Sequence, residues 1–192
     1  MQEESSMSKM TLSQLDELRD QMKAGRVTRE NMQAFLRNPN RFFSSGLLPT
    51  SYDQSIGLVA LIERAAGPSN LKNINRDITQ ERFKLAGSCV RTVNLRVEPY
   101  LNFETSEQAA LRLVAAGRTL ANTGDLAGFL HDHPEEVEKW KWVLVISEDS
   151  RWARSDVPIY VPFASVRGEA RFFLLHRFRY HLFSTGGVLV CD

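Results

Sequence analysis

The strongest pattern along the chain is an apolar run between charged residues at 140–147, Trp-Lys-Trp-Val-Leu-Val-Ile-Ser. Before this run, apolar residues recur mostly at helical spacing. After it, aromatic and β-branched residues dominate and the helical period fades. A short continuous apolar run fits a strand that is buried on both faces of a sheet. We therefore predict a central strand here, with residues 89–97 and pieces between residues 159 and 190 as its neighbours.

Residues 170–183 alternate with a period of two, which predicts a further strand. One face would be apolar and the other basic. The apolar face comprises Phe172, Leu174, Phe178, Tyr180 and Leu182, and the basic face Arg171, Arg177, Arg179 and His181. We expect Phe172, Phe178 and Leu182 to be buried, with Arg177 and Arg179 exposed. In the strand expected over residues 159–166, Pro162 favours a sheet edge or a bulge, because proline lacks the N–H that a ladder needs.

Capping signals and helical spacing predict helices before the central run. Residues 10–45 contain two amphipathic stretches joined by a short turn around Gly25, which predicts a helical hairpin. A helix that begins after Ser51 or Asp53 should end at Gly67-Pro68. Thr105 and Gln108 form a capping-box pattern, and Pro134 opens a last short helix.

Together these elements predict an α+β fold with an N-terminal helical hairpin, a helix-rich middle, and a mainly antiparallel sheet built from the C-terminal third. We expect a disordered lead over residues 1–9, the hairpin arm over residues 10–45, and one α+β domain over residues 46–192.

Composition adds limits on the environment and the partners. The chain has 192 residues, of which 43% are hydrophobic and 24% charged, and its formal net charge of +1 gives no global field for nucleic acid or membrane. Cys89 and Cys191 make no disulfide framework, which favours a reducing compartment. The polar start predicts no secretory signal, and no apolar run approaches the ~18 residues that span a membrane. We expect a cytoplasmic protein without membrane contact.

Several segments share a pattern: residues 30–39 (Glu-Asn-Met-Gln-Ala-Phe-Leu-Arg-Asn-Pro), 116–121 (Ala-Gly-Arg-Thr-Leu-Ala), 142–147 (Trp-Val-Leu-Val-Ile-Ser) and 161–163 (Val-Pro-Phe), together with Pro134. In these segments the chain resembles a family of short bacterial hypothetical proteins, mainly from uncultivated lineages, over about residues 25–192. That family has no assigned activity, so the resemblance implies no catalytic residue. Where the family ends in a Trp-rich strand followed by Arg-Phe-Leu-Ala-Val-Arg, this chain has Gly187-Val-Leu-Val-Cys191, and no C-terminal binding surface carries over. The order of helices and closing strands is also similar to C-type-lectin-like domains, at the level of the fold.

The leading functional hypothesis is a non-enzymatic binding or protein-interaction module for a protein or small-molecule ligand. A catalyst needs a nucleophile or base beside an orienting partner, and no such set stands out, so we predict no catalytic residue and no cofactor. Binding surfaces favour aromatic anchors beside arginines. The predicted binding residues are Trp152, Arg151, Arg154, Arg177, Arg179 and Tyr180.

Two alternatives remain open. A small-molecule or metal-dependent enzyme could use His131 and His133, because alternating histidines can share one ion and Glu135 and Glu136 follow closely. Against this, a pair of histidines without distant partner ligands is a weak metal motif. Nucleic-acid binding ranks third: the basic face of residues 171–181 could follow a phosphate backbone, with Tyr180 or Trp152 stacking on bases.

Overall fold

The computed structural model describes residues 46–85, 87–101, 104–154, 157–179 and 186–192, with the backbone alone for Arg154 and Val157. The predicted disordered lead and helical hairpin arm, over residues 1–9 and 10–45, lie outside the described residues. Within them the fold is α+β, as predicted. No helix of the described part is long and apolar enough to cross a membrane.

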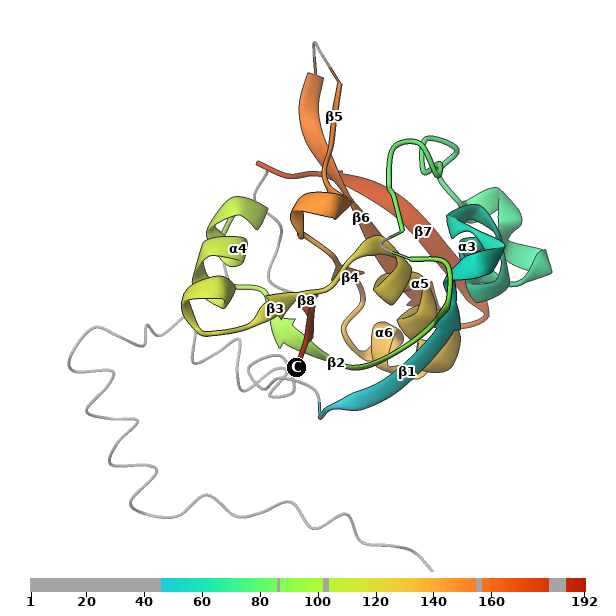
Figure 1. Ribbon diagram of the computed structural model, residues 1–192, viewed down its shortest axis with the longest axis horizontal. Helices are drawn as coiled ribbons and strands as arrows, with labels where there is room; N and C mark the ends of the chain where they lie inside the picture. The colour runs from blue at the N-terminus through green and yellow to red at the C-terminus, as the bar shows by residue number, and fades with distance from the viewer. Residues whose placement is uncertain (1–45, 86, 102–103, 155–156, 180–185) are drawn as a thin grey trace, which may run out of the picture. The chain divides into compact units, whose positions relative to one another are not determined.

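One mixed sheet organises the described residues (Figure 1). Its strands follow the order β1-β2-β8-β4-β6-β5, while β3 pairs with β8 and β7 pairs with β6. All pairs are antiparallel except β4 with β8. The strands are β1 (Leu48–Asp53), β2 (Val90–Pro99), β3 (Thr119–Leu120), β4 (Val143–Leu144), β5 (Trp152–Arg154), β6 (Val157–Arg167), β7 (Ala170–Arg177) and β8 (Gly187–Cys191). The prediction that the sheet is built from the C-terminal third is wrong, because β1, β2 and β3 precede that third; of these three strands, the sequence predicted β2, over residues 89–97.

The sequence did not predict β1, because this strand is short, lies at the edge of the sheet and has a weak apolar pattern. Of its Leu-Pro-Thr-Ser-Tyr-Asp sequence, only Thr50 and Tyr52 are buried. Its outer edge is bonded to side chains at the end of helix α5 (Thr123–Asp132) and just beyond it. His133 donates from Nε2 to the Pro49 carbonyl at 2.9 Å, and the Asp132 carboxylate accepts from the Ser51 N–H at 3.1 Å. Two of the edge backbone groups are thereby satisfied without a further strand.

The predicted central strand is confirmed, since β4 lies between β8 and β6. Val143, Leu144, Val145 and Ile146 are fully buried. Val143 and Val145 pack into one core, and Leu144 and Ile146 pack into a second core on the opposite face. This is the two-sided burial that a continuous apolar run indicates.

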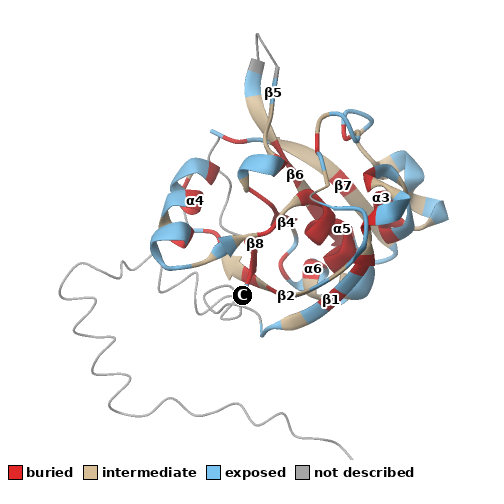
Figure 2. Ribbon diagram, viewed as in Figure 1, coloured by how far each residue is buried: buried red, intermediate tan, exposed pale blue. Residues whose placement is uncertain are grey.

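Helices cover the two faces of the sheet unequally. Helices α3 (Leu58–Ala66), α5 and α6 (Pro134–Lys139) pack on one side, called here the helical face, and α4 (Ser106–Ala115) packs on the other, called the α4 face. In Figure 1, α4 lies to the left and α3 to the right. Helix α5 is buried throughout most of its length (Figure 2). The chain also forms short 3-10 turns η2 (Gln54–Ile56), η3 (Pro68–Asn73) and η4 (Glu148–Ser150).

Three helix-boundary signals are confirmed, but the predicted helix start after Ser51 or Asp53 is wrong: Asp53 caps only the 3-10 turn η2, and α3 begins at Leu58 after Gly57. Thr105 accepts from the Gln108 N–H, and the Gln108 side chain accepts from the Thr105 N–H at 2.8 Å, which completes the predicted capping box. Helix α3 ends at Ala66, and Gly67 takes a φ of 81° immediately before Pro68. Pro134 occupies the start of α6.

β7 has the predicted period, but the wrong face was assigned to the core. Phe173 is fully buried against the helical face, and Arg171 on the same side donates to the Ala65 carbonyl of α3 at 2.8 Å. Phe172, predicted to be buried, is only half-buried on the α4 face. Apolar residues occupy both sides of this strand, so alternation alone could not identify the covered face. Phe178 is buried and Arg177 and Arg179 are exposed, as predicted. Leu182 lies outside the described residues.

Pro162 does not lie at an edge, because β6 pairs with β4, β5 and β7. The Pro162 carbonyl accepts from the Val145 N–H at 3.1 Å. In a strand the N–H and C=O of one residue point to the same side. On this side of β6, Phe163 pairs with β4 and Tyr160 pairs with β5, so Pro162 lies at the change from one partner strand to the other. The missing N–H of Pro162 faces this junction, and no ladder bond is lost there.

We expect Phe173→Ala to destabilise the protein by about 3–5 kcal/mol, since it empties a fully buried site. Phe172→Ala should have a much smaller effect, because that ring is already half exposed. Urea unfolding followed by circular dichroism would measure both. Equal losses of stability would contradict the face assignment.

Candidate functional site

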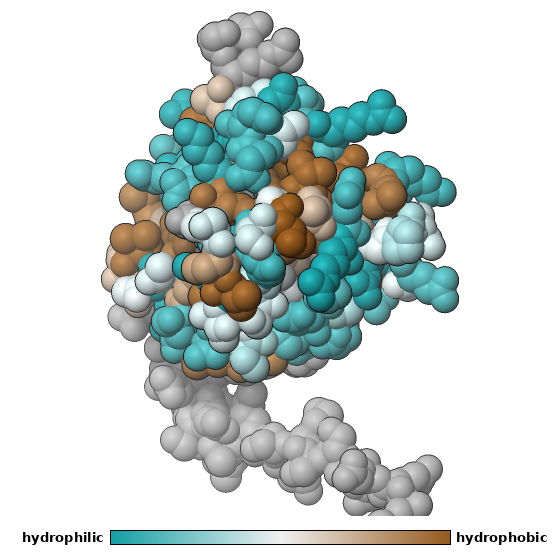
Figure 3. Space-filling model, turned by 45° about the vertical axis from the view of Figure 1, so that its right-hand side comes forward, coloured by the Kyte–Doolittle hydropathy of each residue, from teal (hydrophilic) through white to brown (hydrophobic). Residues whose placement is uncertain are grey.

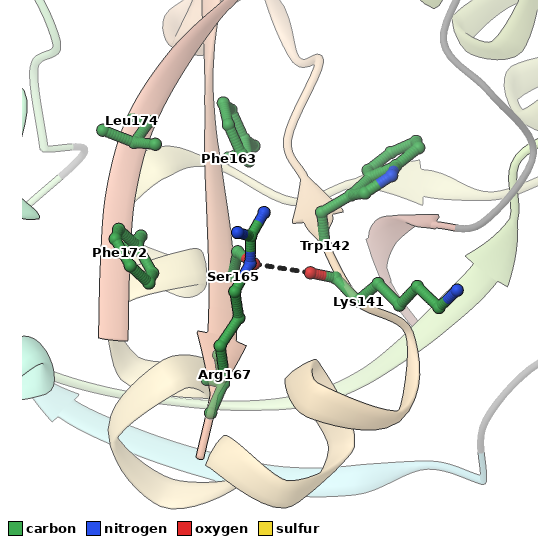
Figure 4. A pocket seen from close by; sticks show the side chains of 8 residues that line it. Lys141, Trp142, Phe163, Ser165, Arg167, Phe172 and Leu174 are labelled. Atoms are coloured by element: carbon green, nitrogen blue, oxygen red, sulfur yellow. Dashed lines mark hydrogen bonds between the residues drawn. The ribbon is translucent and has the colours of Figure 1, made fainter. Parts of the chain in front are cut away.

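A cavity of about 600 Å³ opens on the α4 face, between β6, β7 and the residues that lead into β4. Figure 4 shows its side chains. The lining is mainly aromatic and apolar, with a few polar groups. It comprises Lys141, Trp142, Phe163, Ser165, Val166, Arg167, Phe172 and Leu174.

Strand register brings the walls of this cavity together. Phe163 lies opposite Leu174 and Ser165 opposite Phe172 in the β6–β7 pair, so these four side chains share one face. Helix α4 packs through Ala109, Ala110 and Leu113 into the core that contains Leu144 and Val188. Among the described residues, no helix covers the β6–β7 part of this face. The aromatic floor therefore stays open.

Residues 141–142 form the opposite wall in a constrained backbone. Lys141 has a φ of 60°, the only positive value at a non-glycine position in the described part of the chain. Ser165 Oγ donates to the Lys141 carbonyl at 2.6 Å, which fixes this turn against β6. Trp142 packs edge-on to Tyr100, with 5.4 Å between ring centroids. A Cβ at Gly186 would lie 2.0 Å from the indole, so only glycine permits this approach.

Arg167 gives the cavity its charge. Its guanidinium lies 5.7 Å from the centroid of the Phe172 ring, and it makes no ion pair with another described residue. In Figure 4 this guanidinium points into the space between Phe172 and Trp142, whereas the Lys141 ammonium extends away from it. A cation over an aromatic face is held in position while its N–H donors stay available.

Two of the predicted binding residues, Trp152 and Arg151, pack toward different cores. Trp152 is half-buried beside the helical-face core, with the Arg82 guanidinium 4.1 Å from its ring and Tyr160 at 5.8 Å. Arg151 packs toward the other core: it donates to the Ile146 carbonyl at 3.1 and 3.2 Å and lies 4.5 Å from the Phe178 ring.

Of the remaining predicted binding residues, two arginines with described side chains lie at and just beyond the end of β7. Arg177 and Arg179 are exposed, and Arg179 lies 3.8 Å from Glu107 of α4. The Arg154 side chain and Tyr180 lie outside the described part. The structure thus brings Arg179 to α4, and it does not gather the predicted set around the cavity.

The histidine pair lies at the junction of α5 and α6, on the side of β1. His131 is exposed, whereas His133 is half-buried with its ring 5.3 Å from Phe129. Nε2 of His133 is already bonded to the Pro49 carbonyl, so binding a metal through this nitrogen would break that bond. Within the described ranges, no group of three or more His, Cys, Asp or Glu side chains could hold a metal ion.

A buried polar cluster around Asp125 is a further concentration of titratable groups. The Asp125 carboxylate accepts from the Tyr52 hydroxyl at 2.8 Å, the Arg91 guanidinium at 2.9 Å and the Asn122 N–H at 2.9 Å. The Cys191 thiol lies 3.8 Å away. Burial raises the pKa of Tyr52 and raises the pKa of Cys191 to about 11, so both stay protonated near neutral pH. Because every carboxylate bond joins α5 to a strand or caps the helix, we assign this cluster to the fold.

Exposed apolar side chains elsewhere are dispersed. Figure 3 shows apolar side chains interspersed with hydrophilic ones on one face. Most of the large exposed ones lie on separate elements, and only Leu111 and Val114 share one, α4: Leu47, Ile56, Val59, Leu71, Val90, Leu101, Leu111 and Val114. Single exposed apolar residues are ordinary on soluble proteins. The cavity is the better candidate site because its apolar residues converge.

Sequence reasoning missed the cavity because its residues come from three segments. The sequence feature that could have indicated the cavity is the presence of apolar residues on both faces of β7. The Asp125 cluster had one local signal, the Asn122-x-x-Asp125 capping box, which the structure contains.

The two thiols should differ sharply in reactivity. At about pH 8, the exposed Cys89 should react quickly with Ellman's reagent, whereas Cys191 should react only after unfolding, because it is buried and protonated. The Cys89→Ser variant should lose the fast phase. A fast phase that persists in the folded variant would show that Cys191 is accessible.

Comparison with protein-family models, with curated proteins and with solved structures found no match to this chain. The resemblance to the short bacterial family stays a prediction. The functional assignment therefore rests on the residues and geometry of the chain itself.

Proposed function

We propose that the protein is a binding module that holds a small molecule in the cavity between β6, β7 and residues 141–142, without changing it chemically. The observation that carries this proposal is a cavity of about 600 Å³ with an aromatic, apolar floor on an uncovered part of the sheet. Small-molecule sites are typically concave, mostly apolar and about 300–1,000 Å³ in volume, with few polar groups that orient the ligand.

The polar groups of the lining support binding over catalysis. The hydroxyl of Ser165 is engaged by the Lys141 carbonyl, and the side chain of Ser165 is almost fully buried. The guanidinium of Arg167 offers hydrogen-bond donors and no acceptor, so it does not suit a general base. The lining contains neither an imidazole nor a carboxylate. Its groups suit recognition of a ligand better than proton transfer to it.

Neither alternative gains a supporting observation from the described residues. The histidines of the enzyme hypothesis lie at the α5–α6 junction, outside the cavity lining. The basic face of the nucleic-acid hypothesis is interrupted, because Arg171 is turned to the Ala65 carbonyl on the helical face.

The test is a fragment titration followed by amide chemical shifts of nitrogen-15-labelled protein. Ligands should shift residues 141–142, 163–167 and 172–174. Phe172→Ala should weaken binding about tenfold, or 1.4 kcal/mol, because it removes an aromatic wall. The matched control is Leu111→Ala, an exposed apolar residue of α4 outside the lining, which should leave binding unchanged.

Fragments that bind only elsewhere on the chain would overturn the site. A fragment that is converted to product during the titration would overturn the non-enzymatic role. One-dimensional spectra of the ligand after prolonged incubation distinguish these outcomes.

A further inference from the structure

We infer that the ligand of this cavity is a small monocarboxylic acid with an aromatic or branched apolar body, and that Arg167 binds its carboxylate. This inference rests on the proposed binding function and adds the chemical class of the ligand. Three observations carry it: the sign of the charge at the cavity, the state of Arg167, and the shape of the apolar lining.

The positive charge of the cavity lining favours an anionic ligand. The charged residues of the lining are Lys141 and Arg167, and none is acidic. The formal net charge of the whole chain is only +1, so this positive charge is a local feature. A second hollow, of about 550 Å³ near the start of α6, has the opposite character: Glu135, Glu138 and Glu169 line it, together with Arg171. The two hollows would therefore select ligands of opposite sign.

Arg167 differs from the arginines that serve the fold. Arg112 binds Glu104 through two bonds of 2.8 and 3.0 Å, and Arg91 binds Asp125. Arg96 lies 2.8 Å from Asp192. Among the described residues, the interaction partner of the Arg167 guanidinium is the Phe172 ring alone. A guanidinium has a planar fork of donors that matches a carboxylate, and stacking on a ring pre-orients that fork.

The single inward cation sets the charge of the ligand. Arg167 points into the cavity, whereas the Lys141 ammonium extends away from its centre (Figure 4). A phosphate ester carries between one and two charges near neutral pH and favours several convergent donors. One guanidinium is matched by one carboxylate.

The rest of the lining sets the body of the ligand. Phe163, Phe172 and Leu174 come from paired strands, and Trp142 faces them across the cavity. These four side chains are partly exposed, so a ligand with a flat or branched apolar body would bury them further. Acetate carries the charge but has no such body, and should bind weakly.

The experiment compares acids with neutral molecules of the same shape. Isothermal titration with phenylacetate and phenylacetamide forms one pair, and isovalerate with isovaleramide forms the other. We expect at least one acid to bind about 10–100-fold more tightly than its amide, as charge-assisted hydrogen bonds predict, and more tightly than acetate. Raising the salt concentration should weaken the acid alone.

Variants separate the charge from the apolar body. Arg167→Gln should remove the preference for the acid and leave amide binding unchanged. Phe172→Ala should weaken both acid and amide, and the acid by the larger factor, because the ring also orients the Arg167 guanidinium. Arg76→Gln, which removes an exposed arginine outside the lining, is the matched control and should change neither. Melting temperatures close to wild type would show that each variant is folded.

The outcomes distinguish this inference from the proposed function. Equal binding of acid and amide that is lost in Phe172→Ala overturns the inference and leaves the binding function intact. Tight acid binding that persists in Arg167→Gln overturns the role of Arg167. Binding of neither member of either pair overturns the inferred ligand class, and the fragment titration then decides the function by itself.

Discussion

A buried carboxylate in the first turn of α5 fixes the helical layer to the sheet. Asp125 is 1% exposed, and its hydrogen bonds reach Tyr52 on β1, Arg91 on β2 and the N-terminal backbone of its own helix. Asp125 is buried, so loss of Arg91 would leave its carboxylate without the opposite charge; this costs about 3–5 kcal/mol for a fully buried pair and less here, because the Arg91 side chain is 35% exposed. The glycines of α5 allow the close approach that these bonds need. A Cβ at Gly128 would lie 2.6 Å from the Tyr52 ring.

The attachment of α5 to the sheet through Asp125 places the helical layer on one face, and the unequal covering of the two faces leaves the cavity open. Three helices fill the helical face, and their side chains meet Val143, Phe173 and Leu189 from the sheet. Among the described residues, the α4 face has one helix, placed toward β3 and β8, and its core ends near Phe163 and Trp142, which are only partly buried. The same sheet thus presents a sealed layer on one side and an apolar surface with space for a ligand on the other.

Local signals in the sequence predicted much of the fold, whereas the site depends on tertiary contacts. The apolar run at residues 143–146, the Thr105–Gln108 capping box and the Gly67-Pro68 stop each act within a few residues, and all three are found. The face of β7 that is buried depends on where α3 packs, and the strand itself is apolar on both sides. Asp125 meets Tyr52 and Cys191 across 73 and 66 residues, separations that no local pattern encodes. Grouping Arg151 with Trp152 overlooked a local rule, because consecutive residues of an extended chain point to opposite faces.

The bonds at the outer edge of β1 also bear on self-association. An unpaired edge strand is a template onto which another chain can add by backbone pairing. At β1 the Pro49 carbonyl and the Ser51 N–H are already engaged by His133 and Asp132. A second molecule could pair there only after the end of α5 had moved away from the sheet. Resistance to edge-to-edge aggregation at β1 is therefore coupled to the docking of α5, and local unfolding of that helix end would expose the template.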